Sequence, residues 1–388
     1  MANTLGDRPH RRSFLRAIGA GAAAIGVSGA LSGTGAAQDE ETDDEPAGYL
    51  SIIYDDGPAE DYDMYRIHRE YDAPGCTAAC SGLVDSDESW LTTEQLEEMS
   101  DFGWEVMSHT VDHRPLGKVS IEADVEADDD RIYAQTNNQG RFEGDPIVVL
   151  DGESKAKATV VGNGEDDTGL YIELEEPIGQ RFDATEAFVR YTDEFIEEIL
   201  ANSRAQLEEI VGEGWITGFI YPYERNDGFV SEAISNHYDA APRRDKAGGL
   251  NPESSIDPHA LSREYMETDR MDEDEIERFL DTVANEPDYG ILAGHSQYDT
   301  LPPERLEFVL EQAQQRDIQV VTVQDALDAF GVVDAPERNI EDETPDDATT
   351  DEDNEDGGRA TGGDESSEED EPDGFFARIF AFFRSLFN

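Results

Sequence analysis

GYLSIIYDDGP, residues 48–58, is an apolar and aromatic run that ends in two adjacent carboxylates. Its β-branched and aromatic side chains, closed by a Gly-Pro pair, predict a buried strand with Asp55 and Asp56 at its carboxyl end. A helical pattern follows over 59–71, and strand and helix patterns then alternate as far as His109. This alternation predicts an α/β fold with active residues at the carboxyl ends of parallel strands.

The pattern changes over 119–183, where short strand patterns are separated by turn signals. The strongest turn signals are Asp151-Gly152 and the Gly-Asn-Gly run at 162–164. We therefore expect a small all-β insertion at 119–183, within a catalytic domain formed by 48–118 and 184–331. In the second part of that domain, helices are predicted over 184–211, 272–284, 303–315 and 323–330, and strands over 215–221, 289–293 and 319–322.

Both ends of the chain read as segments outside this domain. Residues 1–37 carry a twin-arginine pattern at 11–16 before a weakly apolar Ala/Gly run, which is typical of an export signal. Residues 38–47 form an acidic linker, and 334–373 have almost no apolar side chains, so we expect a disordered tail there. We expect an exported protein, extracellular or associated with the cell surface.

Residues 374–388 place phenylalanine, isoleucine and leucine along one side of a predicted amphipathic helix. Fifteen residues are too few to span a bilayer, but such a helix could lie in the membrane interface as a peripheral contact. The alternative is that it docks on the protein itself or on a partner. The sequence leaves both interpretations open.

Charge is the most unusual feature of the composition. The chain has 92 acidic and 28 basic residues, and only four of its 388 residues are lysine. A surface of this kind suits a protein that must stay hydrated in high salt, so we expect a halophilic source. The charge also argues against nucleic acid as a partner, because no basic patch is available to neutralise phosphates.

The two cysteines, Cys76 and Cys80, are four residues apart. In an extended strand their Cα atoms would be about 13 Å apart, which is too far for a disulfide, whereas a turn or helix would allow one. We expect a short strand with two buried thiols. No second Cys/His pair accompanies them, so a metal site is the weaker interpretation.

Three segments place metal-binding or proton-transfer groups at predicted strand ends: 54–57, 108–113 and 291–296. His109 and His113 lie four residues apart in one loop. Such a pair also arises by chance, but two imidazoles and one carboxylate would leave a metal open to water, as hydrolytic metal sites require. Adjacent carboxylates at a strand end can divide the work, with one binding the metal and the other acting as a base.

Together these segments resemble the polysaccharide deacetylases, the NodB-like carbohydrate esterases of family 4. The family's Thr-Phe-Asp-Asp-Gly motif is matched by 53–57, its His-Ser/Thr-x-x-His motif by 109–113, and its apolar strand before a histidine by 291–295. Further typical segments are Trp90-Leu91-Thr92, Gly103-Trp104-Glu105 and Phe219-Ile220-Tyr221-Pro222-Tyr223. The resemblance covers about 48–118 and 184–331 and leaves the insertion out.

The resemblance implies a distorted (β/α)7 barrel of the NodB type, with the all-β insertion added to it. It implies hydrolysis of N- or O-linked acetyl groups from an acetylated polysaccharide or glycan. It also implies a divalent metal ion, expected to be zinc, bound by Asp56, His109 and His113.

The remaining roles follow from the same resemblance. Asp55 would act as general base on the attacking water, and His295 would protonate the leaving amine or alkoxide. The backbone N–H of Tyr223 would help the metal to stabilise the oxyanion. The alternative for His295 is a structural histidine at a strand end.

The sequence departs from the family pattern in two places. Where the family has an arginine that anchors the catalytic aspartate, this chain has Ile220. Arginines that could replace it are Arg225, Arg243, Arg244 and Arg263. The Asp-x-x-Asp-Trp-like motif that orients the catalytic histidine is also not recognisable, and Asp239, Asp245 and Asp257 are the candidates for its role. Sequence alone does not choose among them.

Two other functions remain open. A catalytically impaired carbohydrate-binding protein on the same barrel is favoured by Ile220, whereas the retention of Asp55 favours an enzyme, because metal binding alone does not need both carboxylates. A structural protein of the cell surface would account for the acidic tail and the terminal helix. It would leave the His/Asp set unexplained.

Overall fold

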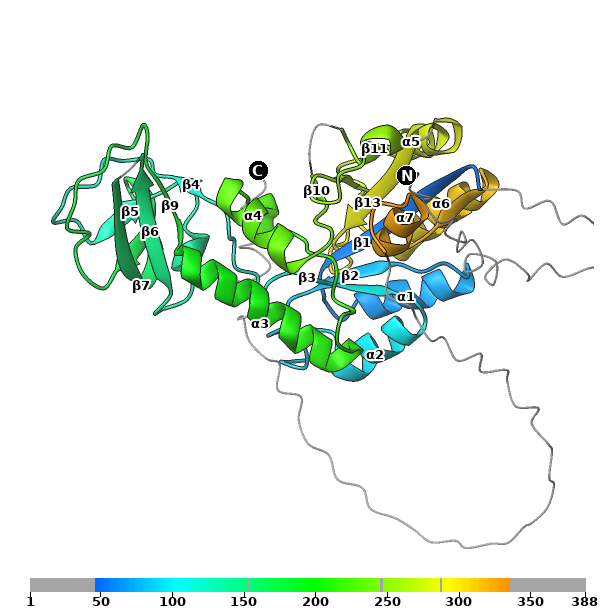
Figure 1. Cartoon of the computed structure of the whole chain (residues 1–388), viewed down its shortest axis with the longest axis horizontal. Helices are drawn as coiled ribbons and strands as arrows, with labels where there is room; N and C mark the ends of the chain where they lie inside the picture. The colour runs from blue at the N-terminus through cyan, green and yellow to red at the C-terminus, as the bar shows by residue number, and fades with distance from the viewer. Residues whose placement is uncertain (1–45, 153, 245–246, 287, 335–388) are drawn as a thin grey trace, which may run out of the picture. The chain divides into compact units, whose positions relative to one another are not determined.

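The computed structural model describes residues 46–152, 154–244, 247–286 and 288–334 (Figure 1). The predicted export signal, most of the acidic linker, nearly all of the acidic tail and the helix at 374–388 lie outside these residues. Within the described ranges, no helix is both long enough and apolar enough to cross a membrane.

Strand β1 (Gly48–Asp56) is the centre of a parallel sheet. It pairs with β13 (Asp288–Gly294) on one side and with β2 (Cys76–Ala79) on the other. β3 (Glu105–Ser108) extends the sheet beyond β2, and β12 (Ser262–Tyr265) extends it beyond β13. Because all these pairings are parallel, the carboxyl ends of the five strands lie at one edge, where the predicted site residues are expected to meet.

Shorter strands complete this sheet. β10 (Arg243–Arg244) pairs in parallel with β12, β14 (Ile318–Val320) pairs in parallel with β1, and β11 (Leu250–Pro252) pairs antiparallel with β13. The strand predicted over 215–221 is wrong as a regular strand. It forms only isolated parallel bridges, Ser108–Phe219 and Gly218–Ala240, because its backbone groups are divided between two neighbouring segments. These bridges continue the sheet from β3 towards β10.

Helices that pack on this sheet bury amphipathic faces. They are α1 (Asp61–Glu70), α2 (Thr93–Asp101), α3 (Asp193–Val211), α4 (Gly228–His237), α5 (Glu273–Asn285), α6 (Pro303–Gln315) and α7 (Val323–Ala329). Thr92 and Asp272 form capping boxes at the starts of α2 and α5. In α5 the buried residues Ile276, Phe279, Leu280 and Val283 recur at helical spacing.

The insertion forms a separate antiparallel sheet with the strand order β4-β9-β6-β7-β8-β5 (Figure 1). Its strands are β4 (Val119–Ser120), β5 (Arg131–Tyr133), β6 (Pro146–Asp151), β7 (Ser154–Asp166), β8 (Gly169–Leu174) and β9 (Phe188–Tyr191). The predicted α/β fold with an added all-β part is therefore confirmed.

Two details of the prediction are wrong. The helix expected from residue 184 begins only at Asp193, because Phe188–Tyr191 is composed of strand-forming side chains and pairs with both β4 and β6. The turn expected at 162–164 lies inside β7, whose glycines accommodate an irregularity in the pairing with β8 after Val160. The chain reverses between β7 and β8 instead, at 167–168.

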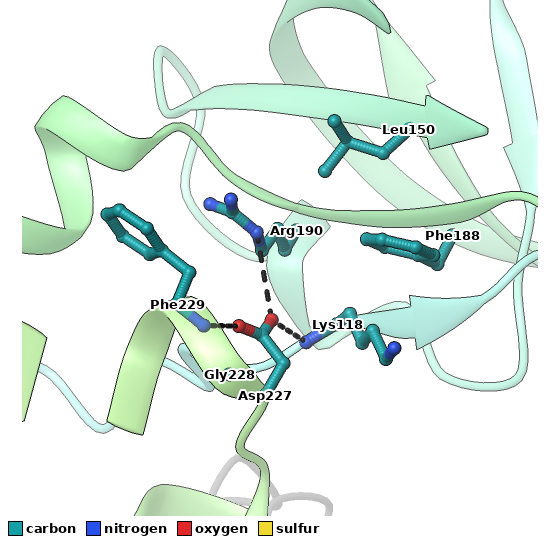
Figure 2. A pocket seen from close by; sticks show the side chains of 7 residues that line it. All are labelled: Lys118, Leu150, Phe188, Arg190, Asp227, Gly228 and Phe229. Carbon is teal, nitrogen blue, oxygen red and sulfur yellow. Dashed lines mark hydrogen bonds and ion pairs between the residues drawn. The ribbon is translucent and has the colours of Figure 1, made fainter. Parts of the chain in front are cut away.

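The insertion and the main sheet are joined at the start of α4 (Figure 2). Asp227 caps this helix, with Oδ1 accepting from the N–H of Phe229 at 2.9 Å. Its other oxygen accepts from the N–H of Lys118 at 3.1 Å and lies 3.6 Å from Nε of Arg190 in β9. The Asp227 carboxylate thus connects α4 to the segment that enters the insertion, at Lys118, and to its last strand, at Arg190. These contacts lie beside a cavity of about 310 Å³.

Cys76 and Cys80 are buried and are not joined by a disulfide, in line with the expected short strand with two buried thiols. We expect neither thiol to react with Ellman's reagent in the folded protein and both to react after unfolding, because burial excludes the reagent and raises the pKa of Cys80. The measurement is thiol titration with and without denaturant. Reaction of a thiol in the folded protein would contradict the buried positions, and a melting temperature that depends on reductant would contradict the unbonded state.

Candidate active site

The structure brings the three predicted metal ligands together. Asp56 ends β1, His109 directly follows β3, and His113 lies in the same loop. Oδ1 of Asp56 is 3.3 Å from Nε2 of His109 and 3.1 Å from Nε2 of His113. One ligand atom from each residue lies within 4.8 Å of the other two, a spacing that could hold a cation.

The chemistry of this donor set fits a divalent metal. Oδ1 of Asp56 is buried and makes no hydrogen bond, although buried oxygens are normally satisfied. Burial lowers the pKa of His113 to about 3, so this imidazole is neutral, as a metal ligand must be. Burial alone would raise the pKa of Asp56, but His113 and His109 bring it below its ordinary value. An ionised carboxylate and at least one neutral imidazole therefore face one point.

Neighbouring groups orient the ligands. His109 donates from Nδ1 to the backbone oxygen of Ile220 at 2.8 Å, which leaves Nε2 free towards Asp56. Gln297 donates to Oδ2 of Asp56 at 2.8 Å, so that Oδ1 remains available. The backbones of Asp56, Thr110 and His113 all have positive φ values, between 57° and 80°. Non-glycine residues adopt this region at a cost in energy, and such strain is concentrated at functional sites.

Asp55 is anchored by Arg263. Two parallel hydrogen bonds join them, from Nη1 to Oδ1 at 2.6 Å and from Nη2 to Oδ2 at 2.8 Å, and both side chains are buried. Burial alone would raise the pKa of Asp55, but Arg263 lowers it below its ordinary value. Asp55 is therefore ionised, as a general base requires.

Arg263 on β12 supplies the cation that the sequence lacks at position 220. Of the other candidates, Arg244 pairs with Glu264, and neither Arg225 nor Arg243 forms an ion pair within the described chain. Arg263 also binds Glu224, with Nη2 2.7 Å and Nε 3.2 Å from Oε1.

His295 follows β13 and is oriented by Glu267. Its Nδ1 donates to Oε1 of Glu267 at 2.7 Å, and its Nε2 lies 3.8 Å from Oδ2 of Asp55. Burial alone would lower the pKa of His295, but Glu267 and the nearby Asp56 and Asp55 raise it to about 9. The imidazole is therefore protonated at neutral pH, the state that a general acid needs.

The partner of His295 is thus not one of the aspartates that the sequence suggested. Asp239 and Asp257 do not contact it, and Asp245 lies outside the described residues. Glu267 was missed because the family pattern directs attention to aspartate. Tyr265 was missed as well; its ring stacks on His295 with centroids 5.2 Å apart, and its hydroxyl donates to Asp55 at 3.2 Å.

Tyr223 lies beside the metal ligands, with its ring centroid 4.4 Å from that of His113. Tyr223 and Glu224 have φ values of 57° and 54°, so two successive non-glycine residues adopt the left-handed conformation. Glu224 anchors this strained turn, because its carboxylate accepts from Arg263 and from the backbone N–H of Arg244 at 2.9 Å.

Residues 42–142 match the family model described as polysaccharide deacetylase. The match contains Asp55 and the three candidate metal ligands, whereas Arg263, Glu267 and His295 lie beyond it. No curated protein matches the chain.

Solved structures similar to this chain include an acetyl xylan esterase of family 4 from Clostridium thermocellum, in complex with a cobalt ion. It is 12% identical, with 74% of this chain and 93% of that chain covered and a TM-score of 0.39. A family 4 carbohydrate esterase from Streptomyces lividans, in complex with acetate, is 8% identical over 71% and 92% of the two chains, with a TM-score of 0.38. Similarities this low carry no argument about activity.

We expect Arg263→Met to destabilise the fold strongly, because it leaves the Asp55 carboxylate buried without its counter-charge. Breaking a buried pair in this way costs about 3–5 kcal/mol of unfolding free energy. Arg244→Met, on the adjacent β10, breaks a more exposed pair and should cost less than about 1 kcal/mol. Denaturant unfolding at constant salt measures both. Equal losses of unfolding free energy in the two variants would show that the Asp55–Arg263 pair contributes no more to stability than the more exposed pair.

Proposed function

We propose that the protein is an exported, metal-dependent hydrolase that removes N- or O-linked acetyl groups from an acetylated polysaccharide. We further propose that the parallel sheet forms a distorted (β/α)7 barrel of the NodB type. The observation that carries the function is the position of Asp55. This ionised carboxylate, anchored by Arg263, is adjacent to the Asp56–His109–His113 set and lies 3.8 Å from the protonated His295.

Each step of the proposed reaction has a group in place. A divalent metal, expected to be zinc, would be held by Asp56, His109 and His113 and would supply Lewis acidity. Asp55 accepts the proton of the attacking water, since its charge is held by Arg263. The backbone N–H of Tyr223 donates to the developing oxyanion. His295 protonates the leaving amine or alkoxide, and Glu267 keeps its imidazole protonated and oriented.

The contact with Arg263 also favours an enzyme over the carbohydrate-binding alternative. That alternative was favoured by Ile220, because an unanchored Asp55 would be a poor base. The bidentate contact with Arg263 removes this reason. An ion pair with such good geometry, spanning strands far apart in the sequence, is difficult to explain in a protein that only binds sugar.

Export by the twin-arginine route, a location outside the cell and a halophilic source are proposals that rest on the sequence. The acidic composition and the pattern at 11–16 support them. Peripheral membrane contact through 374–388 is a proposal of the same kind.

The direct test is acetate release from acetylated oligosaccharides by the zinc-loaded protein in high salt. We expect turnover by the wild type and a loss of at least about 100-fold in Asp55→Asn, because general base catalysis contributes on that scale. Asp55→Asn should retain zinc binding, whereas Asp56→Asn should lose it; both are measurable by calorimetry. Asp63→Asn, on the exposed face of α1, is the matched control. No turnover by the wild type, with sugar binding unchanged in Asp55→Asn, would favour a binding protein.

We expect Glu267→Gln to move the alkaline limb of the pH–rate profile to lower pH by about one unit or more. His295 has a pKa raised to about 9 and is active as an acid only while protonated, so activity declines as the pH rises through that pKa. Removing the carboxylate lowers this pKa. Glu264→Gln, whose side chain binds Arg244 instead, is the control. If Glu267→Gln lowers the rate but leaves the alkaline limb at the same pH, Glu267 has only a structural role and does not set the pKa of His295.

A further inference from the structure

The insertion contributes a cation to the edge of the candidate site. Arg141 directly follows the 3₁₀ turn η1 (Asn138–Gly140) of the insertion. Its Nη1 donates to the hydroxyl of Tyr223 at 3.0 Å, and the ring of Tyr223 lies against His113. The guanidinium thus reaches the edge of the candidate metal centre through Tyr223.

Tight packing holds this part of the insertion in place. Gln139 donates to the backbone oxygen of Gly117 at 3.4 Å. A Cβ atom on Gly117 would lie 2.4 Å from the backbone nitrogen of Asn226, so only glycine allows this close approach to the loop after Tyr223. The segments 139–141, 117–118 and 223–226 are therefore packed together, and the position of Arg141 is fixed relative to the site.

Arg141 is exposed and forms no ion pair within the described chain. The other arginines between 114 and 190 are all paired: Arg114 with Asp145, Arg131 with Asp166, Arg181 with Asp124 and Arg190 with Asp193. The remaining N–H donors of Arg141 are available to a ligand.

A second cation lies on the adjoining segment. Lys118 also forms no ion pair within the described residues, and its ammonium lies 4.7 Å from the ring of Phe188. Lys118 and Phe188 line the cavity in Figure 2 with the apolar side chains of Leu150 and Phe229 and with the Arg190–Asp227 ion pair. Because Arg190 and Asp227 pair with each other, Lys118 is the charged group of this lining that has no carboxylate partner in the described residues. Apolar walls with a few charged groups are typical of ligand sites.

We propose that the candidate active site selects acetylated glycans that carry negative charge. Arg141 binds a carboxylate or sulfate group beside the candidate metal centre, and Lys118, at the cavity, binds a second anionic group farther along the glycan. The inference rests on the proposed deacetylase function and specifies its substrate class. Guanidinium matches both anions through paired hydrogen bonds. The acidic surface does not prevent this, because in high salt long-range repulsion is screened within about 3 Å, whereas direct contacts persist.

The test compares neutral and anionic substrates that share the acetylated sugar. Chitotetraose and a hyaluronan tetrasaccharide both contain N-acetylglucosamine, but only the second contains glucuronate. For O-acetyl groups, acetylated xylotetraose is compared with and without a glucuronate branch. Sulfated chitotetraose separates sulfate from carboxylate binding. We expect kcat/KM to favour at least one anionic member of these pairs about tenfold in the wild type. If kcat/KM shows no preference for the anionic member of either pair and none for sulfated chitotetraose, the proposal is overturned.

Three variants locate the preference. Arg141→Gln should reduce the ratio of anionic to neutral kcat/KM to near one, and Lys118→Gln should reduce it less. Arg131→Gln, at a partly exposed and ion-paired arginine of β5, should leave the ratio unchanged. Tyr223→Phe removes the hydroxyl that Arg141 binds but keeps the guanidinium, so the preference should survive. Loss of the preference in Tyr223→Phe as well would mean that Arg141 only positions Tyr223.

Binding measurements separate this inference from the proposed function. The dissociation constants of the same oligosaccharides are measured by calorimetry with the zinc-loaded full chain. If no acetate is released but the anionic members bind more tightly in the wild type than in Arg141→Gln, the deacetylase proposal fails and the anion site stands. If both members of each pair are turned over without any charge preference, the deacetylase proposal stands and the anion site fails.

Discussion

The buried ion pair between Arg263 and Asp55 is the interaction on which the site depends. Removing both charges from water is costly, and only good geometry and further hydrogen bonds repay that cost. Here the contact is bidentate, and Glu224 and Tyr265 satisfy the remaining groups. Because the pair joins β1 to β12, and Arg263 also holds the strained turn after Pro222, one guanidinium positions both the candidate base and the candidate oxyanion donor.

Two neighbouring groups are driven to opposite protonation states. Asp55 has a lowered pKa because a cation faces it, and His295 has a raised pKa because Glu267 and the aspartates face it. Environments that separate the pKa values of adjacent groups identify the base and the acid. The two partners, Arg263 and Glu267, lie within and just after β12, so this one strand sets both protonation states.

The insertion is a sheet of its own, yet it reaches the site through one well-packed turn. Gly117 allows the close approach, and Arg141 extends from the insertion to Tyr223. Positive φ values at Asp56, His113 and Tyr223 show that the backbone is strained where these elements meet. Such strain persists only where the surrounding contacts impose it. The separate sheet is therefore well placed to tune the specificity of a site whose chemistry belongs to the parallel sheet.

The sequence by itself was sufficient for the α/β alternation, the all-β insertion and the grouping of Asp56, His109 and His113. These depend on local patterns and on the rule that parallel strands bring their carboxyl ends to one edge. It could not identify the partners of Asp55 and His295, since Arg263 is 208 residues from Asp55 and Glu267 is 28 residues from His295. Nor could it show that Phe188–Tyr191 is a strand, because the pairing with β4 and β6 decides that. A long-range contact leaves no periodicity in the chain, so only the tertiary structure determined which cation and which carboxylate complete the site.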